Sequence, residues 1–342
     1  MKPSKLLVLV LALGLIMGLT GTLQAAPHYR YHSIDQGSGS EPARFINDNG
    51  QVVVNSNDHT YLWSQNGGFT DLGHLGGGKT YGYGINNLGQ IVGESYINST
   101  TSHAFLWQSG QMSDLGGLSG GVRSIAVSIN NLGVIIGGSF FSDNSISPFR
   151  WTFNDKLQPM DLQGGIAFKI IDDGRMVGGK NNHAWLWNAP GAGTDLGGLT
   201  GFGYTEAQDI NINGQVVGFA TLAQDVEYPT HAFSWTTGGG LQDLSVAGRD
   251  SRAFGINNQG YIVGWSDFQS ETSGALWTPG GDLLNLDALV VGKPAGVSIG
   301  DAYGINQKGF IVGKVIATGA AYMLVPAQMP NPSPGSLLLL LQ

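Results

Sequence analysis

Four histidines occupy one position of a repeat that runs through the chain, and metal binding is the first chemistry that such a set suggests. Metal ligands must all lie about 2 Å from one ion, whereas equivalent positions of successive repeats are expected to lie far apart. Three other copies of the position hold Pro148, Gly274 or Ala320. We therefore expect a structural role, with each imidazole bonded to a repeat aspartate or to the backbone. The four are His59, His103, His183 and His231.

Aspartates recur in the same way, each just before a glycine-rich corner. Acidic oxygens in loops suit calcium, but the dense Asp-x-Asp-x-Asp-Gly pattern of a calcium loop is absent. Aspartate side chains also accept backbone N–H groups at turns, and we expect this capping role instead. The sequence predicts neither a metal site nor a bound cofactor. The aspartates are Asp71, Asp114, Asp161, Asp195 and Asp243, with Asn285 in the sixth copy.

Six tryptophans end the same apolar segment of successive repeats, which predicts that they pack in the core. A sugar-binding platform would need exposed aromatic rings. Two tryptophans, Trp185 and Trp265, lie outside the repeated position and are our candidates for contact with a ligand. The repeated ones are Trp63, Trp107, Trp151, Trp187, Trp235 and Trp277, with Leu324 in the seventh copy.

The motifs of common enzymes are missing. There is no nucleophile elbow, zinc-binding helix, phosphate loop or dinucleotide fingerprint. Because the chain has no cysteine, it has no thiol nucleophile, thiolate zinc site or disulfide. A glycosidase needs two carboxylates at a set separation in one pocket. Glutamates in variable segments could supply them, but the sequence does not bring them together, and we assign no catalytic residue. They are Glu94, Glu206, Glu227 and Glu271.

The elements that hold these residues follow from the repeat itself. An Ile-Asn-x-x-Gly turn followed by a short apolar strand occurs seven times, at intervals of 39 to 49 residues. Such a hairpin needs its glycine at positive φ, and the asparagine can accept a backbone N–H and close the turn. The asparagine is replaced by Ile171 in the fourth copy. The copies begin at Ile46, Ile85, Ile129, Ile170, Ile210, Ile256 and Ile305.

Each copy adds two further segments, a His-Ala-Phe-x-Trp strand and an Asp-Leu-Gly strand. Four antiparallel strands at this spacing are typical of a β-propeller blade. A parallel β-helix usually spends fewer residues on each rung, and an α-solenoid would show an apolar stripe at helical spacing, which is absent after residue 26. We predict an all-β, seven-bladed β-propeller of four-stranded antiparallel blades over residues 29–326.

The two ends of this region complete one another. The seventh copy supplies a hairpin over residues 301–313 and a third strand over residues 321–325, but no Asp-Leu-Gly strand follows. Residues 31–37 have the pattern of an orphan fourth strand that precedes the first hairpin. We therefore predict that an N-terminal strand completes the last blade and leaves no open sheet edge.

The Ile-Asn-x-x-Gly-x-Ile-Val-Gly, His-Ala-Phe-x-Trp and Asp-Leu-Gly-Gly-Leu blocks together resemble the HAF repeat, a family of repeat proteins expected outside the bacterial cell. The triplet that gives the family its name stands at residues 103–105 and 231–233. The likeness covers residues 29–325. It implies an extracellular location but no defined chemistry.

Both ends of the chain have the pattern of targeting signals. Lys2 and Lys5 precede an apolar run over residues 6–20 and then small residues, which predicts a secretory signal peptide over residues 1–25. The alternative is an uncleaved membrane anchor. Residues 327–342 form a Pro/Leu-rich tail that resembles a degenerate PEP-CTERM sorting signal. Asn331 stands where glutamate is expected, and no basic cluster follows the leucine run. The alternative is an apolar tail without a sorting role.

The charge of the chain argues against some classes of binding partner. The formal net charge of −8 argues against sequence-independent binding of nucleic acid and against docking by charge on an anionic membrane. Glycine makes up 55 of 342 residues, about twice its usual share, which fits a chain with many turns.

An exported propeller without a catalytic motif predicts a non-catalytic extracellular or cell-surface binding module. We expect a monomer whose partner is an extracellular protein or a glycan. Loops carry function on rigid propellers, so the variable segments 98–102, 141–147, 223–229 and 290–298 are the expected interaction surface. Two alternatives stay open. One is a secreted polysaccharide-active enzyme with carboxylates at the mouth of the ring, and the other is a structural component of the extracellular matrix.

Overall fold

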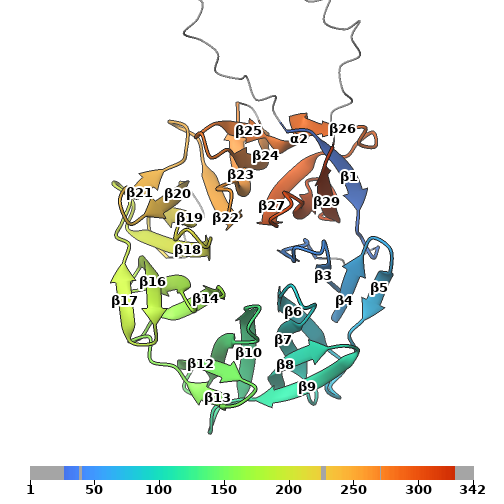
Figure 1. Ribbon diagram of the computed structural model, residues 1–342, viewed down its shortest axis with the longest axis vertical. Helices are drawn as coiled ribbons and strands as arrows, with labels where there is room; N and C mark the ends of the chain where they lie inside the picture. The colour runs from blue at the N-terminus through green and yellow to red at the C-terminus, as the bar shows by residue number, and fades with distance from the viewer. Residues whose placement is uncertain (1–26, 38–40, 225–228, 270, 328–342) are drawn as a thin grey trace, which may run out of the picture.

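The fold is a closed ring of small sheets. The computed structural model describes residues 27–37, 41–224, 229–269 and 271–327. In this part of the chain seven sheets stand around one central axis, as the blades of a β-propeller (Figure 1). The predicted all-β, seven-bladed architecture is confirmed. The helix α2 (Leu286–Leu289) is a single short turn between the last two blades.

Six blades contain four antiparallel strands each, in chain order from the axis outward. The first three blades are β2 (Phe45–Ile46), β3 (Val52–Ser56), β4 (His59–Ser64) and β5 (Gly68–Asp71); β6 (Thr80–Ile85), β7 (Ile91–Tyr96), β8 (Ser102–Gln108) and β9 (Gln111–Gly116); and β10 (Arg123–Ile129), β11 (Ile135–Phe140), β12 (Ile146–Thr152) and β13 (Lys156–Pro159). The next three are β14 (Ile166–Ile170), β15 (Met176–Lys180), β16 (His183–Ala189) and β17 (Ala192–Asp195); β18 (Tyr204–Ile210), β19 (Val216–Thr221), β20 (Thr230–Thr236) and β21 (Gly240–Asp243); and β22 (Ser251–Ile256), β23 (Ile262–Phe268), β24 (Glu271–Trp277) and β25 (Leu283–Asn285).

The seventh blade is assembled from both ends of the described chain. Its strands β27 (Ile299–Ile305), β28 (Ile311–Val315) and β29 (Ala321–Pro326) are followed by β1 (Tyr29–Ser33), which lies antiparallel beside β29 (Figure 1). Tyr31 pairs with Leu324 and Ser33 with Tyr322, so the predicted closure by an N-terminal strand is confirmed. The sequence did not reveal β26 (Val290–Val291), a two-residue strand that adds to the outer side of β1 in parallel.

The repeated turn joins the first and second strands of every blade. In the second blade Asn86 Oδ1 accepts hydrogen bonds from the backbone nitrogens of Leu88 (3.1 Å) and Gln90 (3.0 Å). Gly89 has a φ of 75°, a conformation that costs glycine little and other residues much more. Both predicted roles, the turn-closing asparagine and the glycine at positive φ, are confirmed.

The same asparagine also links neighbouring blades, which the sequence did not show. Asn86 Nδ2 donates to the carbonyl oxygen of Asn130 in the next blade, at 2.9 Å. Five further joints carry an equivalent bond. At the joint between the fourth and fifth blades, where Ile171 lacks the amide, Arg175 Nη2 donates instead to the carbonyl oxygen of Ile212, at 2.7 Å. We call this circle of linked turns the turn ring.

The hydrophobic core lies between the blades rather than at the axis. Each of seven clusters combines buried side chains of neighbouring sheets; one packs Val53 of the first blade against Ile91 and Trp107 of the second. Five of the six repeated tryptophans are buried and Trp235 is half-buried. Their predicted role in the core is confirmed.

The predictions for the termini fall largely outside the described residues. This applies to the signal peptide over residues 1–25 and to residues 328–342 of the tail. Within the described part of the chain, no helix has the length and apolar character needed to cross a bilayer.

Candidate functional site

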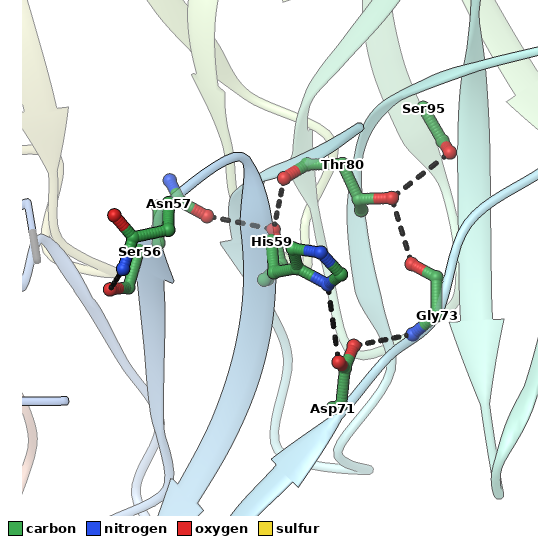
Figure 2. Close-up of polar contacts among 9 residues, drawn as sticks. Ser56, Asn57, His59, Asp71, Gly73, Thr80 and Ser95 are labelled. Atoms are coloured by element: carbon green, nitrogen blue, oxygen red, sulfur yellow. Dashed lines mark hydrogen bonds and ion pairs between the residues drawn. The ribbon is translucent and has the colours of Figure 1, made fainter. Parts of the chain in front are cut away.

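Each repeat histidine lies on the third strand of its blade, beside the repeat aspartate on the fourth strand. Figure 2 shows the first pair, in which His59 Nδ1 lies 3.2 Å from Asp71 Oδ2. The equivalent distances in the second, fourth and fifth blades are 2.9, 2.9 and 2.8 Å. The predicted structural role of these histidines is confirmed, since each imidazole pairs within its blade and none converges with another.

The repeat aspartates cap turns as predicted. Asp71 Oδ1 accepts from the backbone nitrogen of Gly73 at 2.8 Å, and the carbonyl oxygen of Gly73 accepts from Thr80 Oγ1 of the next blade at 2.8 Å (Figure 2). The other four aspartates make the same capping bond. Among the described residues, no group of three or more His, Asp or Glu side chains could hold a metal ion.

In six blades, an irregularity of the inner strand turns a side chain toward the axis. Where the register shifts, one extra residue stands opposite the second strand, and such a bulge re-aims a side chain. The bulges of six inner strands present Tyr83, Val127, Phe168, Gln208, Phe254 and Tyr303. Arg44 holds the equivalent place in the first blade, two residues before its repeat isoleucine. We call these seven residues the belt.

The belt lines a cavity of about 370 Å³ on the axis. A second cavity of about 320 Å³ lies at the turn ring, and the repeat isoleucines of all seven blades line it. Four of these isoleucines border both cavities, so the two follow one another along the axis. The first cavity has the size of a small-molecule site, since such pockets occupy about 300–1,000 Å³.

One side of the belt is an aromatic stack that ends in a cation. The Arg44 guanidinium carbon lies 4.0 Å from the centre of the Tyr303 ring, and the rings of Tyr303 and Phe254 are 5.0 Å apart. Tyr303 Oη donates to Asp301 at 2.8 Å, and Lys314 pairs with the same carboxylate. Stacking on an aromatic face fixes the plane of an arginine while its N–H groups stay available.

The fifth blade, next to the sixth blade that carries Phe254, supplies the two carboxylates that line the cavity, Glu206 and Asp209. Asp209 accepts from the backbone nitrogens of Ile210 (2.9 Å) and of Ile256 in the next blade (3.0 Å), and Lys169 Nζ is 3.8 Å away. Glu206 accepts from Gln208 Nε2 at 2.6 Å and from the Tyr204 hydroxyl.

Two of the other candidate glutamates, Glu94 and Glu271, do not line this cavity. Glu94 is buried with 3% of its surface exposed and receives a bidentate bond from Arg123, at 2.8 Å to each oxygen. Tyr83 Oη also donates to Glu94 at 3.2 Å. Glu271 is exposed on β24, and Glu227 lies outside the described residues.

Trp185 and Trp265 stand in different blades and neither lines the belt cavity. Trp185 is half-buried on β16, stacked on Trp187 with ring centres 6.0 Å apart, with Lys180 Nζ 4.3 Å above it. Within the described part of the chain, no group accepts a hydrogen bond from the buried Trp185 Nε1. Trp265 on β23 is 6% exposed, so little of its ring is open to a ligand.

The variable loops share one face of the propeller. Residues 97–101 and 141–145 join second to third strands, and residues 292–298 lead into the seventh blade. Of the variable segment 223–229, residues 225–228 lie outside the described part of the chain. In a four-stranded antiparallel blade these connections lie opposite the turns between first and second strands. The loops therefore surround the end of the axis away from the turn ring, on the belt side of the isoleucines.

Sequence reasoning missed the belt because its members share no residue type. The signal that could have found it is positional, since each belt residue stands two places before the isoleucine of an Ile-Asn-x-x-Gly turn.

The fold is shared with solved structures of low sequence identity. A streptogramin B lyase aligns with a TM-score of 0.59 over 88% of this chain and 98% of its own, at 11% identity. Virginiamycin B lyase from Staphylococcus aureus gives 0.59 over 87% and 100%, at 11% identity. The Cps50 (Swd1) β-propeller domain of Myceliophteria thermophila gives 0.53 over 88% and 100%, at 11% identity. These likenesses show the fold alone. No protein-family model matches the sequence, and no curated protein matches it.

Proposed function

We propose that the protein is a non-catalytic binding module that takes its ligand at the belt cavity, on the loop face of the propeller. The observation that carries this proposal is a contrast between neighbouring positions of the inner strands. The isoleucine position is the same in all seven blades, whereas the belt holds five different residue types. A sevenfold scaffold needs no such variety, but recognition of an asymmetric ligand does.

One carboxylate of the cavity, Asp209, supports a binding role over a catalytic one. A catalytic base must be able to reach a proton of the substrate. Both oxygens of Asp209 instead accept backbone N–H groups, one from its own blade and one from the next. This carboxylate therefore stabilises the joint between the fifth and sixth blades.

Export to the cell surface or medium is part of the proposal and is supported by the sequence of residues 1–25 and by the likeness to the HAF repeat. The alternative is a structural role in the extracellular matrix. It is supported by the resemblance of the Pro/Leu-rich tail to a PEP-CTERM signal. Fractionation of a producing culture distinguishes the two, because a soluble module is recovered from the medium and a matrix component from the insoluble envelope.

The binding role is tested by filling the cavity. Val127→Trp places an indole in the belt, and Leu132→Trp is the matched control, because Leu132 is 73% exposed on the turn-ring face. We expect the parent and the control to retain the same glycans on an array and the same partners from culture fluid and envelope. The Val127→Trp variant should lose them while its unfolding transition stays close to that of the parent. Unchanged binding by this variant would place the site elsewhere.

Turnover is measured on the same ligands. The streptogramin B and virginiamycin B lyases share the fold and are named as enzymes, so a retained glycan is recovered and its mass compared with the input. We expect an intact ligand. A shortened or altered product that depends on Glu206 would favour the alternative of a polysaccharide-active enzyme.

A further inference from the structure

We infer that the belt cavity binds an apolar acid, whose carboxylate meets Arg44 and whose apolar body lies against Phe168 and the repeat isoleucines. This inference rests on the proposed binding function and names the class of its ligand. The chemistry is a single carboxylate carried on an apolar group, which a free aromatic acid and the C-terminal residue of a polypeptide both present.

Arg44 is the cation. Its guanidinium carbon lies 4.0 Å from the centre of the Tyr303 ring, and a contact of this kind covers one face of the planar group. Among residues 27–37, 41–224, 229–269 and 271–327, no group accepts a hydrogen bond from the guanidinium and no carboxylate forms an ion pair with it. The N–H groups at its edge can therefore hold a carboxylate with two parallel hydrogen bonds.

The other polar side chains of the cavity wall are already engaged. Each has at least one hydrogen bond or ion pair within the protein; Gln208 Nε2, for example, donates to Glu206 at 2.6 Å. A ligand rich in hydroxyl groups would have to displace such bonds, at a cost in affinity, whereas a carboxylate on Arg44 displaces none. The engaged side chains are Tyr83, Ser128, Lys169, Glu206, Gln208, Asp209 and Tyr303.

Phe168 supplies an apolar surface away from Arg44. It is half-buried on the inner strand β14 and lines the cavity, but it belongs to none of the seven core clusters of the described chain. In a ring of seven blades the fourth stands as far from the first as any blade does, so Phe168 and Arg44 border the cavity from different sides of the axis. An aromatic ring at the axis that the core does not use is available to the apolar part of a ligand.

The repeat isoleucines extend this apolar surface. Four of them border both the belt cavity and the cavity at the turn ring, so they form a floor between the two. Val127, on the blade next to that of Phe168, adds an aliphatic side chain to the wall. Covering such groups with an apolar body is favourable by about 25 cal/mol for each Å² removed from water. A bare anion would use Arg44 but leave this surface exposed to water.

The charges of the cavity favour an acid with one negative charge. The wall carries two cations, Arg44 and Lys169, and two carboxylates, Glu206 and Asp209, and the whole chain has a formal charge of −8. Like charges repel more strongly where water is partly excluded, so a polyanion would gain at Arg44 and lose against the carboxylates. A monocarboxylate needs only the one cation.

The test is calorimetry on the purified protein with phenylpropanoate, N-acetylphenylalanine, the primary amide of each, acetate and galacturonate. Phenylpropanoate is a free aromatic acid, and N-acetylphenylalanine has the chemistry of a C-terminal residue. We expect at least one of these two apolar acids to bind, and the tighter of them identifies the source of the ligand. Its amide lacks the negative charge, acetate lacks the apolar body, and galacturonate carries hydroxyl groups instead. Each of these three should bind at least about tenfold more weakly.

Substitutions separate the two contacts. Arg44→Gln should weaken binding of the tighter acid by at least about tenfold, and Arg44→Lys should recover only part of it, because an ammonium group keeps the charge but not the fork. Phe168→Ala should weaken binding by about five- to tenfold through the lost apolar contact. The matched controls are Arg150→Gln on β12 and Phe153→Ala, at a side chain that is 77% exposed, and both should bind like the parent.

Several results would overturn the inference and leave the proposed binding function standing. Equal affinity for an apolar acid and its amide, or unchanged affinity in Arg44→Gln, would show that Arg44 does not select the carboxylate. Unchanged affinity in Phe168→Ala would show that the apolar body lies elsewhere. Tighter binding of galacturonate than of either apolar acid would show a saccharide site. No measurable binding of either apolar acid, with the parent protein folded by circular dichroism, would exclude this ligand class. The proposed function fails separately, if cavity filling by Val127→Trp leaves every array and partner signal unchanged.

Discussion

The side chain of Asn306 in the last blade donates from Nδ2 to the carbonyl oxygen of Asn47 in the first, at 2.9 Å and across 259 residues of sequence. The same asparagine accepts from the backbone nitrogens of Lys308 and Phe310 through Oδ1. One buried amide therefore closes its own turn and the ring of turns. Strand β1 completes the seventh blade on the outside of the ring, and the chain then continues into the first blade. The bond between Asn306 and Asn47 joins the same two blades close to the axis.

Replacing this amide by a carboxylate separates its two roles. Asn306→Asp keeps the turn-closing oxygen but places a second oxygen against the carbonyl of Asn47, inside a site where Asn306 is 2% exposed. We expect the free energy of unfolding to fall by about 1–3 kcal/mol, the cost of unsatisfied buried polar groups. The measurement is urea denaturation. The control, Asn154→Asp, adds the same charge at an exposed loop position and should stay within about 0.5 kcal/mol of the parent.

A disulfide tests the closure of the ring by β1. Arg30 pairs directly with Val325, and directly opposite residues of antiparallel strands have Cα atoms about 4.5–5.5 Å apart, within the range that a disulfide spans. Because the chain has no cysteine, Arg30→Cys with Val325→Cys can form only one internal bond. We expect complete oxidation and a stabilisation of about 2–4 kcal/mol.

The matched control moves one partner by two residues. Met323 pairs with His32 rather than with Arg30, and a diagonal neighbour lies about 7–8 Å away, too far for an unstrained bond. Arg30→Cys with Met323→Cys should therefore oxidise slowly or form dimers. Equal cross-linking of both pairs, judged by mobility with and without reductant, would contradict the register.

The sequence was sufficient for the features that recur in every blade. Each repeated turn needs a glycine at positive φ, so Gly89 has an equivalent in all seven blades. Each capped corner needs an acceptor for a backbone N–H, so the aspartate of Asp71 recurs in five blades. The closure was predictable for a similar reason, because a missing strand at one end and an orphan strand at the other are complementary.

The belt was not predictable, because its positions are defined by a backbone irregularity rather than by a residue type. A bulge places Phe168 and Gln208 toward the axis alike, and no side-chain pattern distinguishes them from other inner-strand residues. The inter-blade bond of Asn86 was missed for a related reason. Its turn-closing role accounts for the asparagine fully within one repeat, so nothing in a single copy indicates that Nδ2 bonds to the next.

The ion pair between Glu94 and Arg123 is strongly asymmetric in burial. The Glu94 side chain is 4% exposed and that of Arg123 is 42% exposed. Arg123→Met leaves a buried carboxylate without its cation, and we expect a loss of about 2–3 kcal/mol, below the cost of breaking a fully buried pair. Adding Glu94→Gln should restore part of that loss, because the uncompensated charge is removed.

The exposed pair of Arg150 and Asp155 is the comparison for this cycle, with side chains 38% and 59% exposed. Arg150→Met should cost less than about 1 kcal/mol. If the Glu94→Gln, Arg123→Met double variant were less stable than Arg123→Met alone, the carboxylate would be stabilised by its other donors rather than by the arginine.

Buried tyrosines make the protein sensitive to alkali. Burial, and secondarily nearby Asp301, raise the pKa of Tyr322 well above its ordinary value, and burial likewise raises the pKa of Tyr29. In the unfolded chain both phenols ionise near pH 10. Above that pH the unfolded state has released protons that the folded state keeps, so stability is fully present below about pH 10 and falls as the pH rises.

We expect each such tyrosine to lower the free energy of unfolding by about 1.4 kcal/mol per pH unit above pH 10. Tyr322→Phe removes one of them and should reduce the slope of stability against pH between about pH 10 and 12 while leaving the slope at neutral pH unchanged. Denaturation midpoints at several pH values give the slope, and tyrosinate absorbance identifies the ionisation. A variant with the parent's alkaline slope would show that Tyr322 does not carry the effect.

The repeat aspartates combine two interactions that a conservative pair of substitutions can separate. Asp114 accepts from the backbone nitrogen of Gly116 at 2.7 Å and pairs with His103 at 2.9 Å, and both side chains are partly exposed. Exposed ion pairs contribute about 0–1 kcal/mol, whereas a lost turn bond costs about 0.5–1.5 kcal/mol. Asp114→Asn keeps the capping oxygen, as Asn285 does for Asp287 in the sixth blade at 2.8 Å, and should be nearly neutral. Asp114→Ala loses both bonds and should be the less stable variant in urea denaturation. If Asp114→Asn, Asp114→Ala and His103→Ala all lowered the free energy of unfolding by the same amount, the pair between the imidazole and the carboxylate would be the stabilising contact. The capping bond would then contribute nothing measurable of its own.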